Sequence, residues 1–225
     1  MKSEAIAMRH ATPAWTDIAR DIGDTFAARA AQHDHDGEFV ANNYADLRDR
    51  RLFSAGIPTE LGGGGASHAE VCAIVRELGR HCGSTGLSYA MHSHPVCANV
   101  FKHVRGDAKA TGALKKIAAN EFVIAGTGAN DWLASNGEAI EVDGGYRVNA
   151  HKRFVSGGPG ADLFVTSAIF DGDDGPEVIH FAVPMASSGI EIQGNWDTLG
   201  MRGTGSNDIM MQDVFVPAEA VVARR

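Results

Sequence analysis

The spacing of the apolar residues changes near residue 118, and this change restricts the fold more than any other feature of the chain. Before it, apolar residues recur every three or four positions, as they do on one face of a helix. After it, short apolar stretches alternate with polar residues and turn signals, as they do in strands. The sequence therefore predicts an α+β protein, with a helical domain over residues 1–118 and a small antiparallel β-barrel or sandwich over residues 119–225.

The clearest helix signal begins at Ser67. Ser67 and Glu70 have the spacing of a capping box, in which each side chain binds the other residue's backbone N–H. Apolar residues then follow at helical spacing: Val71, Ile74, Val75 and Leu78. Further helices are predicted over residues 17–31, 39–53 and 85–104, the last one disturbed at Pro95.

Turn signals divide the second half of the chain into short strands. Asp143-Gly144-Gly145 separates two alternating stretches and predicts a hairpin, because Asp-Gly tolerates the positive φ of tight turns. The chain contains 27 glycines in 225 residues, which suits a region with many tight turns. Other strands are predicted over residues 121–125, 162–169, 177–183, 189–192 and 209–216.

Charge and composition exclude several classes of protein. The 20 basic and 28 acidic residues give a net charge of −8 without a basic cluster, so a nucleic-acid partner is not expected. No apolar stretch approaches the length of a membrane span, and the N-terminus lacks the pattern of a signal peptide. The odd number of cysteines, Cys72, Cys82 and Cys97, indicates reduced thiols. We therefore expect a cytoplasmic protein without a membrane partner.

Two pairs of alternating histidines raise the question of a metal site. They are His33 with His35, and His92 with His94. Alternating histidines rarely direct both rings at one ion, and no third ligand follows at metal spacing. We therefore predict no metal site, and we hypothesise that His92 lines a substrate pocket.

Several segments together resemble the acyl-CoA dehydrogenase family. They occur in the family's order and span nearly the whole chain after residue 15. The resemblance implies a helical N-terminal domain, a middle β-domain, and flavin adenine dinucleotide (FAD) held between the β-domain and a C-terminal helical bundle. The matching segments are residues 52–63 (LFSAGIPTELGG), the helix over 67–79, 83–85 (GST), 143–157 (DGGYRVNAHKRFVSG), 161–162 (AD), 199–206 (LGMRGTGS) and 213–217 (DVFVP).

The resemblance also implies a reaction. In the family, a carboxylate of the bundle removes the α-proton of an acyl-CoA while the β-hydride passes to the flavin. The chain ends at Arg225, where the bundle would begin, so we assign no catalytic base and expect weak or absent flavin retention by this chain alone. We expect a homo-oligomer, or a partner chain that supplies the bundle. The alternatives are a monooxygenase of the same fold that receives reduced flavin from a reductase, and a catalytically silent subunit.

The resemblance implies that Phe154, Val155 and Ser156 contact the flavin. The family more often has Trp and Thr where this chain has Phe154 and Ser156. An aromatic ring here could pack on the flavin, and a hydroxyl could bind its N5 edge. Taken alone, the tripeptide is far more typical of a strand end with a buried Phe and a Ser in a turn, and only the ordered family match favours the flavin contact.

A second flavin-contacting segment is implied over residues 121–131. The family carries there a strand and the turn Thr-Glu-Pro-Gly-Ala-Gly-Ser-Asp, which touches the flavin and its pyrophosphate. When Asp131 is aligned with the final Asp, Ile124 replaces the hydroxyl residue and Asn130 replaces the Ser. Ile124 could then contribute only backbone bonds and packing, whereas Asn130 could bind a phosphate. The alternative is an ordinary passage from strand to loop.

Overall fold

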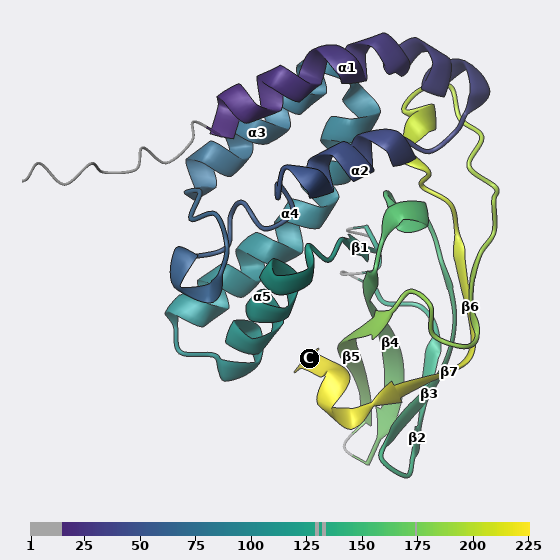
Figure 1. The fold of residues 1–225 in the computed structure, drawn as a ribbon. Helices are drawn as coiled ribbons and strands as arrows, with labels where there is room; N and C mark the ends of the chain where they lie inside the picture. The colour runs from purple at the N-terminus through teal and green to yellow at the C-terminus, as the bar shows by residue number, and fades with distance from the viewer. Residues whose placement is uncertain (1–14, 129–130, 132–133, 174) are drawn as a thin grey trace, which may run out of the picture.

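The computed structural model describes residues 15–128, 131, 134–173 and 175–225, and within these it places a group of helices beside a single sheet (Figure 1). The predicted α+β class is confirmed. α1 packs on α3, α3 on α4, and α4 on α5. The helices are α1 (Trp15–Asp36), α2 (Ala41–Asp49), α3 (His68–His81), α4 (Gly83–Val104) and α5 (Ala108–Asn120), with a short helical turn η1 (Thr59–Leu61).

The capping box at the start of α3 is confirmed. Ser67 Oγ accepts a hydrogen bond from the Glu70 N–H at 3.3 Å, and Glu70 Oε2 accepts one from the Ser67 N–H at 2.8 Å. The apolar stripe that follows packs into the helical core. α4, in contrast, continues through Pro95 and is a single helix of 22 residues.

α5 is a helix that the apolar spacing did not single out. Its start follows a local signal, because Asp107 Oδ1 accepts a hydrogen bond from the Ala110 N–H at 3.0 Å. Its end is marked by Glu121, which takes the left-handed conformation at φ +52°. Leu114 and Ile117 on its inner face are buried against the rest of the helical part.

We predicted a barrel or a sandwich, and the described strands form one open sheet rather than a closed barrel. The order is β6-β7-β3-β2-β4-β5-β8, with β1 beside β4, so β6 and β8 are the edges of the described sheet. The predicted hairpin is confirmed: Val142 pairs with Gly145 across the two-residue turn. The strands are β1 (Ile124–Gly126), β2 (Glu138–Val142), β3 (Gly145–Lys152), β4 (Leu163–Gly172), β5 (Gly175–Pro184), β6 (Ile190–Ile192), β7 (Ile209–Pro217) and β8 (Val221–Arg224).

The sheet is also mixed, where we predicted an antiparallel one. β1 and β2 both run parallel to β4: Ile124 pairs with Leu163, and Glu138 pairs with Ile169. β1 and β2 thus pair with successive stretches of the same strand: β1 pairs with residues 163–165 of β4, and β2 pairs with residues 169–170. Short helical turns lie between strands as η2 (Gly158–Gly160), η3 (Arg202–Thr204) and η4 (Ala218–Ala220).

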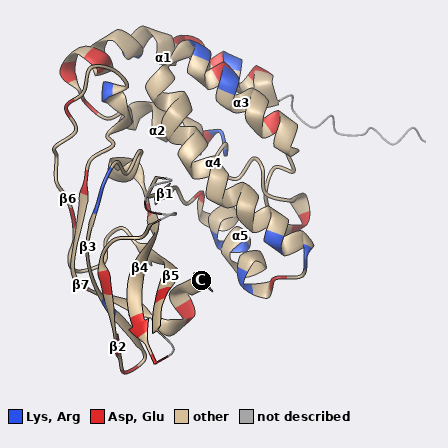
Figure 2. Ribbon diagram, turned by 180° about the vertical axis from the view of Figure 1, so that it is seen from behind, with Lys and Arg blue, Asp and Glu red and all other residues tan. Residues whose placement is uncertain are grey.

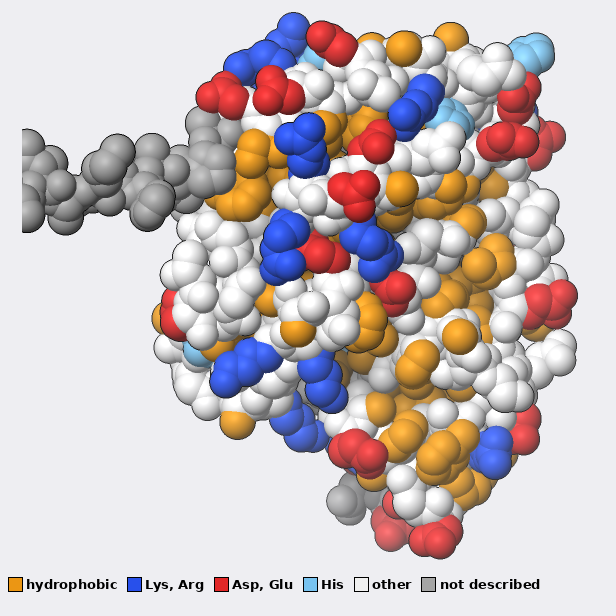
Figure 3. Space-filling view, in the orientation of Figure 1, with side chains coloured by type: hydrophobic (Ala, Val, Ile, Leu, Met, Phe, Trp, Pro, Cys, Tyr) orange, Lys and Arg blue, Asp and Glu red, His pale blue; other side chains and the backbone are white. Residues whose placement is uncertain are grey.

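Three groups of buried side chains stabilise this arrangement. One fills the helical part around Phe26, Phe53 and Tyr89, and another underlies the sheet around Phe164 and Phe181. A third joins the two parts, with members from η1, α4, α5 and β1. Figure 3 shows apolar side chains gathered over the sheet and along its border with the helices, while charged side chains are frequent over the helices. Within the described residues, no helix has both the length and the apolar character that a membrane crossing requires.

Candidate functional site

His92 of α4 connects the helical part to the first strand. Its Nε2 lies 2.8 Å from the carbonyl oxygen of Phe53, and its Nδ1 lies 3.0 Å from the backbone nitrogen of Ile124. A carbonyl only accepts and an N–H only donates, so the ring is neutral with its proton on Nε2. Burial lowers the pKa of His92 to about 4. Both ring nitrogens of His92 are thus bonded within the core, where the ring borders a small cavity, and the hypothesis that it lines a substrate pocket stays a prediction.

Polar bonds also fix the link between α5 and β1. The Arg48 guanidinium donates to the Glu121 carbonyl and to Asp162 Oδ2, both at 2.9 Å, and the same Asp162 oxygen accepts from the Val123 N–H at 2.7 Å. The Glu121 carboxylate accepts hydrogen bonds from the hydroxyl and the backbone N–H of Ser54. These hydrogen bonds therefore join α2 and Ser54 to residues 121–123, which lead from α5 into β1.

Phe154 follows the end of β3 and projects from the molecule. Its side chain is 63% exposed, and its ring edge meets Trp196 with the centroids 6.1 Å apart. The interpretation of this Phe as a buried strand end is thus wrong. Its backbone has φ +58°, a left-handed conformation that costs a non-glycine residue about 1–2 kcal/mol.

Neighbouring bonds hold Phe154 in this conformation. The Val155 N–H donates to the Asn207 carbonyl at 3.1 Å, and the Gly157 N–H donates to the Thr204 carbonyl at 2.9 Å. Val155 itself is fully buried in the sheet core. The left-handed backbone at Phe154 therefore places the Phe154 ring at the surface and the Val155 side chain in the core. Strained backbone of this kind is often found at functional sites.

The helical part supports this segment from behind. A Cβ on Gly157 would lie 2.6 Å from the Tyr44 hydroxyl oxygen, and a Cβ on Gly160 would lie 2.7 Å from the Phe39 ring. Only glycine permits such a close approach between the loop and the helices. The position of Phe154 thus depends on the α2 region as well as on the sheet.

Ser156 belongs to a row of hydroxyl groups. Its Oγ lies 2.8 Å from Ser206 Oγ, which lies 2.6 Å from Thr204 Oγ1. Thr204 in turn donates to the Met201 carbonyl at 2.8 Å. The structure thus brings residues 154–156 together with residues 201–206, two segments that the sequence analysis connected only through the family resemblance.

The other two predicted flavin contacts are placed differently. The Ile124 side chain is 4% exposed and packs in the buried group that joins the helices to the sheet. Its N–H is bound to His92, so its side chain faces the core and not an open site. Asn130 lies outside the described residues.

A buried ion pair joins Asp131 to Lys152 of β3, and it was not predicted from the sequence. Lys152 has no exposed surface, and its Nζ lies 2.7 Å from both Asp131 Oδ1 and the Asn136 carbonyl. The other carboxylate oxygen of Asp131 accepts hydrogen bonds from the hydroxyls of Thr127, Thr166 and Ser167. A sequence signal was present, because Lys152 continues the inward-facing positions of β3.

The pKa shifts of the pair follow from these contacts. Burial by itself raises the pKa of Asp131, but the bonds from Lys152 and Thr127 and the charge of Lys152 outweigh it and lower the pKa. Burial lowers the pKa of Lys152, and Asp131 partly offsets this effect. The charged carboxylate of Asp131 is therefore bound to Lys152 of β3 and to Thr166 and Ser167 of β4.

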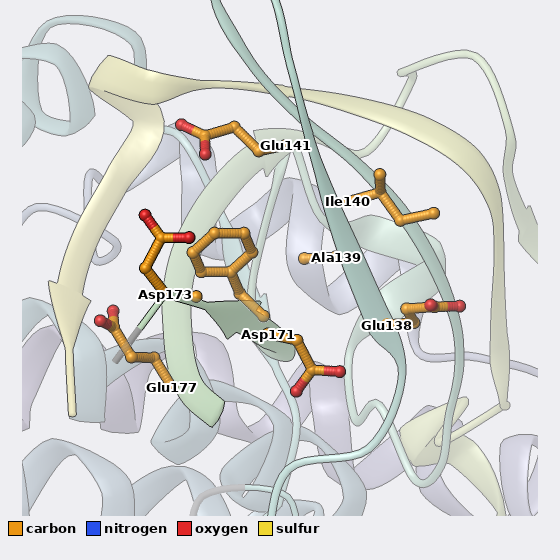
Figure 4. A pocket seen from close by; sticks show the side chains of 9 residues that line it. Glu138, Ala139, Ile140, Glu141, Asp171, Asp173 and Glu177 are labelled. Atoms are coloured by element: carbon orange, nitrogen blue, oxygen red, sulfur yellow. The ribbon is translucent and has the colours of Figure 1, made fainter. Parts of the chain in front are cut away.

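A separate hollow lies at another part of the sheet. It has a volume of about 480 Å³ and borders β2 and the turn between β4 and β5. Figure 4 shows its carboxylates spread around the hollow, and Figure 2 shows the acidic side chains at this end of the sheet. A phosphate-bearing cofactor would be repelled there. The acidic residues are Glu138, Glu141, Asp171, Asp173 and Glu177.

Comparison with known proteins agrees with this architecture. Residues 14–121 match the family model for the acyl-CoA dehydrogenase N-terminal domain, and residues 124–214 match the model for the middle domain. The chain is 30% identical over 207 residues to mitochondrial isovaleryl-CoA dehydrogenase of Oryza sativa subsp. japonica, covering 88% of this chain and 50% of that protein. It is 28% identical over 214 residues to dibenzothiophene monooxygenase of Rhodococcus qingshengii, covering 91% and 50%.

A solved structure resembles the chain equally well. KijD3, in complex with FMN and a dTDP-linked amino sugar, superposes with a TM-score of 0.81 at 28% identity, covering 96% of this chain and 55% of that one. The chain therefore spans about half the length of the relatives it matches. The matches run through both the helices and the sheet, and they show that the chain belongs to the acyl-CoA dehydrogenase family.

Proposed function

We propose that residues 1–118 and 119–225 form two domains of a flavin-dependent oxidoreductase, and that Phe154, Val155 and Ser156 form one wall of its flavin site. The exposed ring of Phe154 carries this proposal. The ring projects from a strained backbone, beside the half-buried Ser156 and next to the buried Val155. An apolar platform with a hydroxyl at its edge fits the flavin ring, which has flat apolar faces and a polar N5 edge.

The first candidate reaction is α,β-dehydrogenation of an acyl-CoA with FAD as cofactor. Its support is the 30% identity to an isovaleryl-CoA dehydrogenase over 88% of the chain. The flavin, when bound, supplies the acceptor for the hydride. Phe154 would orient the ring and Ser156 would bind its edge, while the backbone of Ile124 would lie near the pyrimidine side and Asn130 near a phosphate. We assign the catalytic base to none of the residues of this chain.

The second candidate is a flavin-dependent monooxygenase. The buried Ile124 favours it, because the strand offers no hydroxyl where dehydrogenases of the family usually carry one. The 28% identities to a dibenzothiophene monooxygenase and to an FMN-binding protein also support it. Two assays on the full-length protein separate the candidates. A dehydrogenase passes electrons from acyl-CoA to a dye, whereas a monooxygenase consumes oxygen with supplied reduced flavin. Light scattering would test the proposed homo-oligomer or partner chain.

Replacing Phe154 with alanine is expected to weaken flavin binding by about five- to tenfold, because a stacked aromatic ring contributes about 1 kcal/mol beyond its buried area. The measurement is a fluorescence titration of FMN and of FAD with the wild-type and variant chains. Phe101 is a matched control, since its ring is 58% exposed on α4. Equal binding by Phe154→Ala and Phe101→Ala would contradict the proposed site.

A further inference from the structure

The row of hydroxyl groups behind Phe154 ends on a backbone acceptor at one side and on Ser156 at the other. The acceptor is the carbonyl of Met201, which takes hydrogen bonds from Thr204 Oγ1 at 2.8 Å and from the Thr204 N–H and the Trp196 Nε1–H, both at 3.1 Å. Thr204 and Ser206 are buried and Ser156 is half-buried, whereas the Met201 residue is 47% exposed. The row therefore runs through two buried hydroxyls from the Met201 carbonyl to Ser156 beside the Phe154 ring.

When each of the three oxygen–oxygen contacts is a hydrogen bond, the number of protons sets the direction of each. A carbonyl oxygen can only accept, so the contact with Met201 uses the single proton of Thr204. Thr204 then has no proton for the 2.6 Å contact with Ser206, and Ser206 must donate there. By the same reasoning, Ser156 donates in its 2.8 Å contact with Ser206. Three protons fill three contacts, and all of them point from Ser156 towards the Met201 carbonyl.

We infer that Ser156 presents only lone pairs to a ligand beside Phe154, and that the site therefore favours reduced over oxidised flavin. The inference rests on the proposed flavin site. In the reduced ring N5 carries a hydrogen that can be donated to Ser156, whereas in the oxidised ring N5 carries a lone pair. Ser206 and Thr204 are positioning residues, because they set the direction of the Ser156 hydroxyl without touching the ligand.

Reversing the row to bind an oxidised flavin carries a penalty. If Ser156 donated to the ligand, one of the three contacts would lose its proton and two oxygens would face each other at 2.6–2.8 Å. Water cannot repair this easily, since Thr204 and Ser206 are buried. The net worth of one hydrogen bond corresponds to about a three- to tenfold difference in affinity. A preference for reduced flavin suits the second candidate function, a monooxygenase to which a separate reaction supplies reduced flavin.

The test compares anaerobic titrations of oxidised and reduced FMN into the full-length protein, as wild type and as the Ser206→Ala variant. The variant removes the acceptor of Ser156, whose proton becomes available to the ligand. The ratio of oxidised to reduced dissociation constants is therefore expected to fall about three- to tenfold. Thr204→Val breaks the same row one step further in, and it serves if Ser206→Ala does not fold. Ser93→Ala is the control, because Ser93 is also buried and donates to the Tyr89 carbonyl at 2.8 Å.

Oxidised 5-deaza-FMN provides a second readout, since a C–H group replaces its N5. The wild-type chain is expected to bind it at least as tightly as oxidised FMN, whereas Ser206→Ala should prefer FMN. Weaker binding of the deaza compound by the wild-type chain would overturn the inference, as would a redox ratio that neither variant changes. Absence of saturable binding for every flavin would instead contradict the proposed flavin site itself.

Discussion

Replacing Lys152 with methionine is expected to lower the free energy of unfolding by about 3–5 kcal/mol. The substitution leaves the Asp131 carboxylate buried without its cation, in a site where the Lys152 ammonium lies 2.7 Å away. Methionine has a similar length and fills the space, so the effect reports the lost charge and hydrogen bonds. Urea unfolding, followed by circular dichroism, measures the change.

A second substitution separates the ion pair from its surroundings. In the Lys152→Met background, Asp131→Asn removes the unpaired charge, so the double variant is expected to be more stable than Lys152→Met alone. Lys115→Met is the control, because Lys115 is exposed on α5 and its loss should change stability by less than about 0.5 kcal/mol. A loss for Lys152→Met as small as that of the control would show that the pair is not buried in solution.

Replacing His92 with leucine is expected to lower the free energy of unfolding by about 2–4 kcal/mol near pH 7. The ring bonds the Phe53 carbonyl and the Ile124 N–H, and leucine leaves both of these buried groups without a partner. His94→Leu is the control, since His94 is exposed two residues further along the same helix. If both variants lost the same stability, His92 would not connect the two parts of the fold.

The same residue predicts a dependence of stability on pH. Burial lowers the pKa of His92 from 6.5 to about 4, so the unfolded chain binds the proton first as the pH falls. The contribution of neutral His92 is complete above pH 6.5 and decreases as the pH falls towards 4, by about 3 kcal/mol in all. His180, whose pKa burial also lowers, acts in the same direction. The readout is therefore the difference between wild type and His92→Leu, which should shrink from pH 7 to pH 4.

Local signals in the sequence predicted local structure well. The Ser67 and Glu70 capping box and the Asp143-Gly144 turn both form, because each depends on residues no more than a few positions apart. The ordered family segments indicated the helical part, the strand-rich part and their sequence, and the family assignment is confirmed. The interrupted pairing of β1 and β2 with β4 had no such signal, since parallel partners lie far apart along the chain.

The sequence by itself thus determined the α+β class and the family, and it pointed to residues 154–156 as a candidate flavin-binding segment. Tertiary structure decided how those residues are used: it exposed Phe154, buried His92 and Lys152, and aligned Ser156 with Ser206, 50 positions later. The physical reason is that helix caps and turns depend on backbone bonds between neighbours. Burial, ion pairing and the direction of a hydroxyl proton depend on groups that only the folded chain brings within hydrogen-bonding distance.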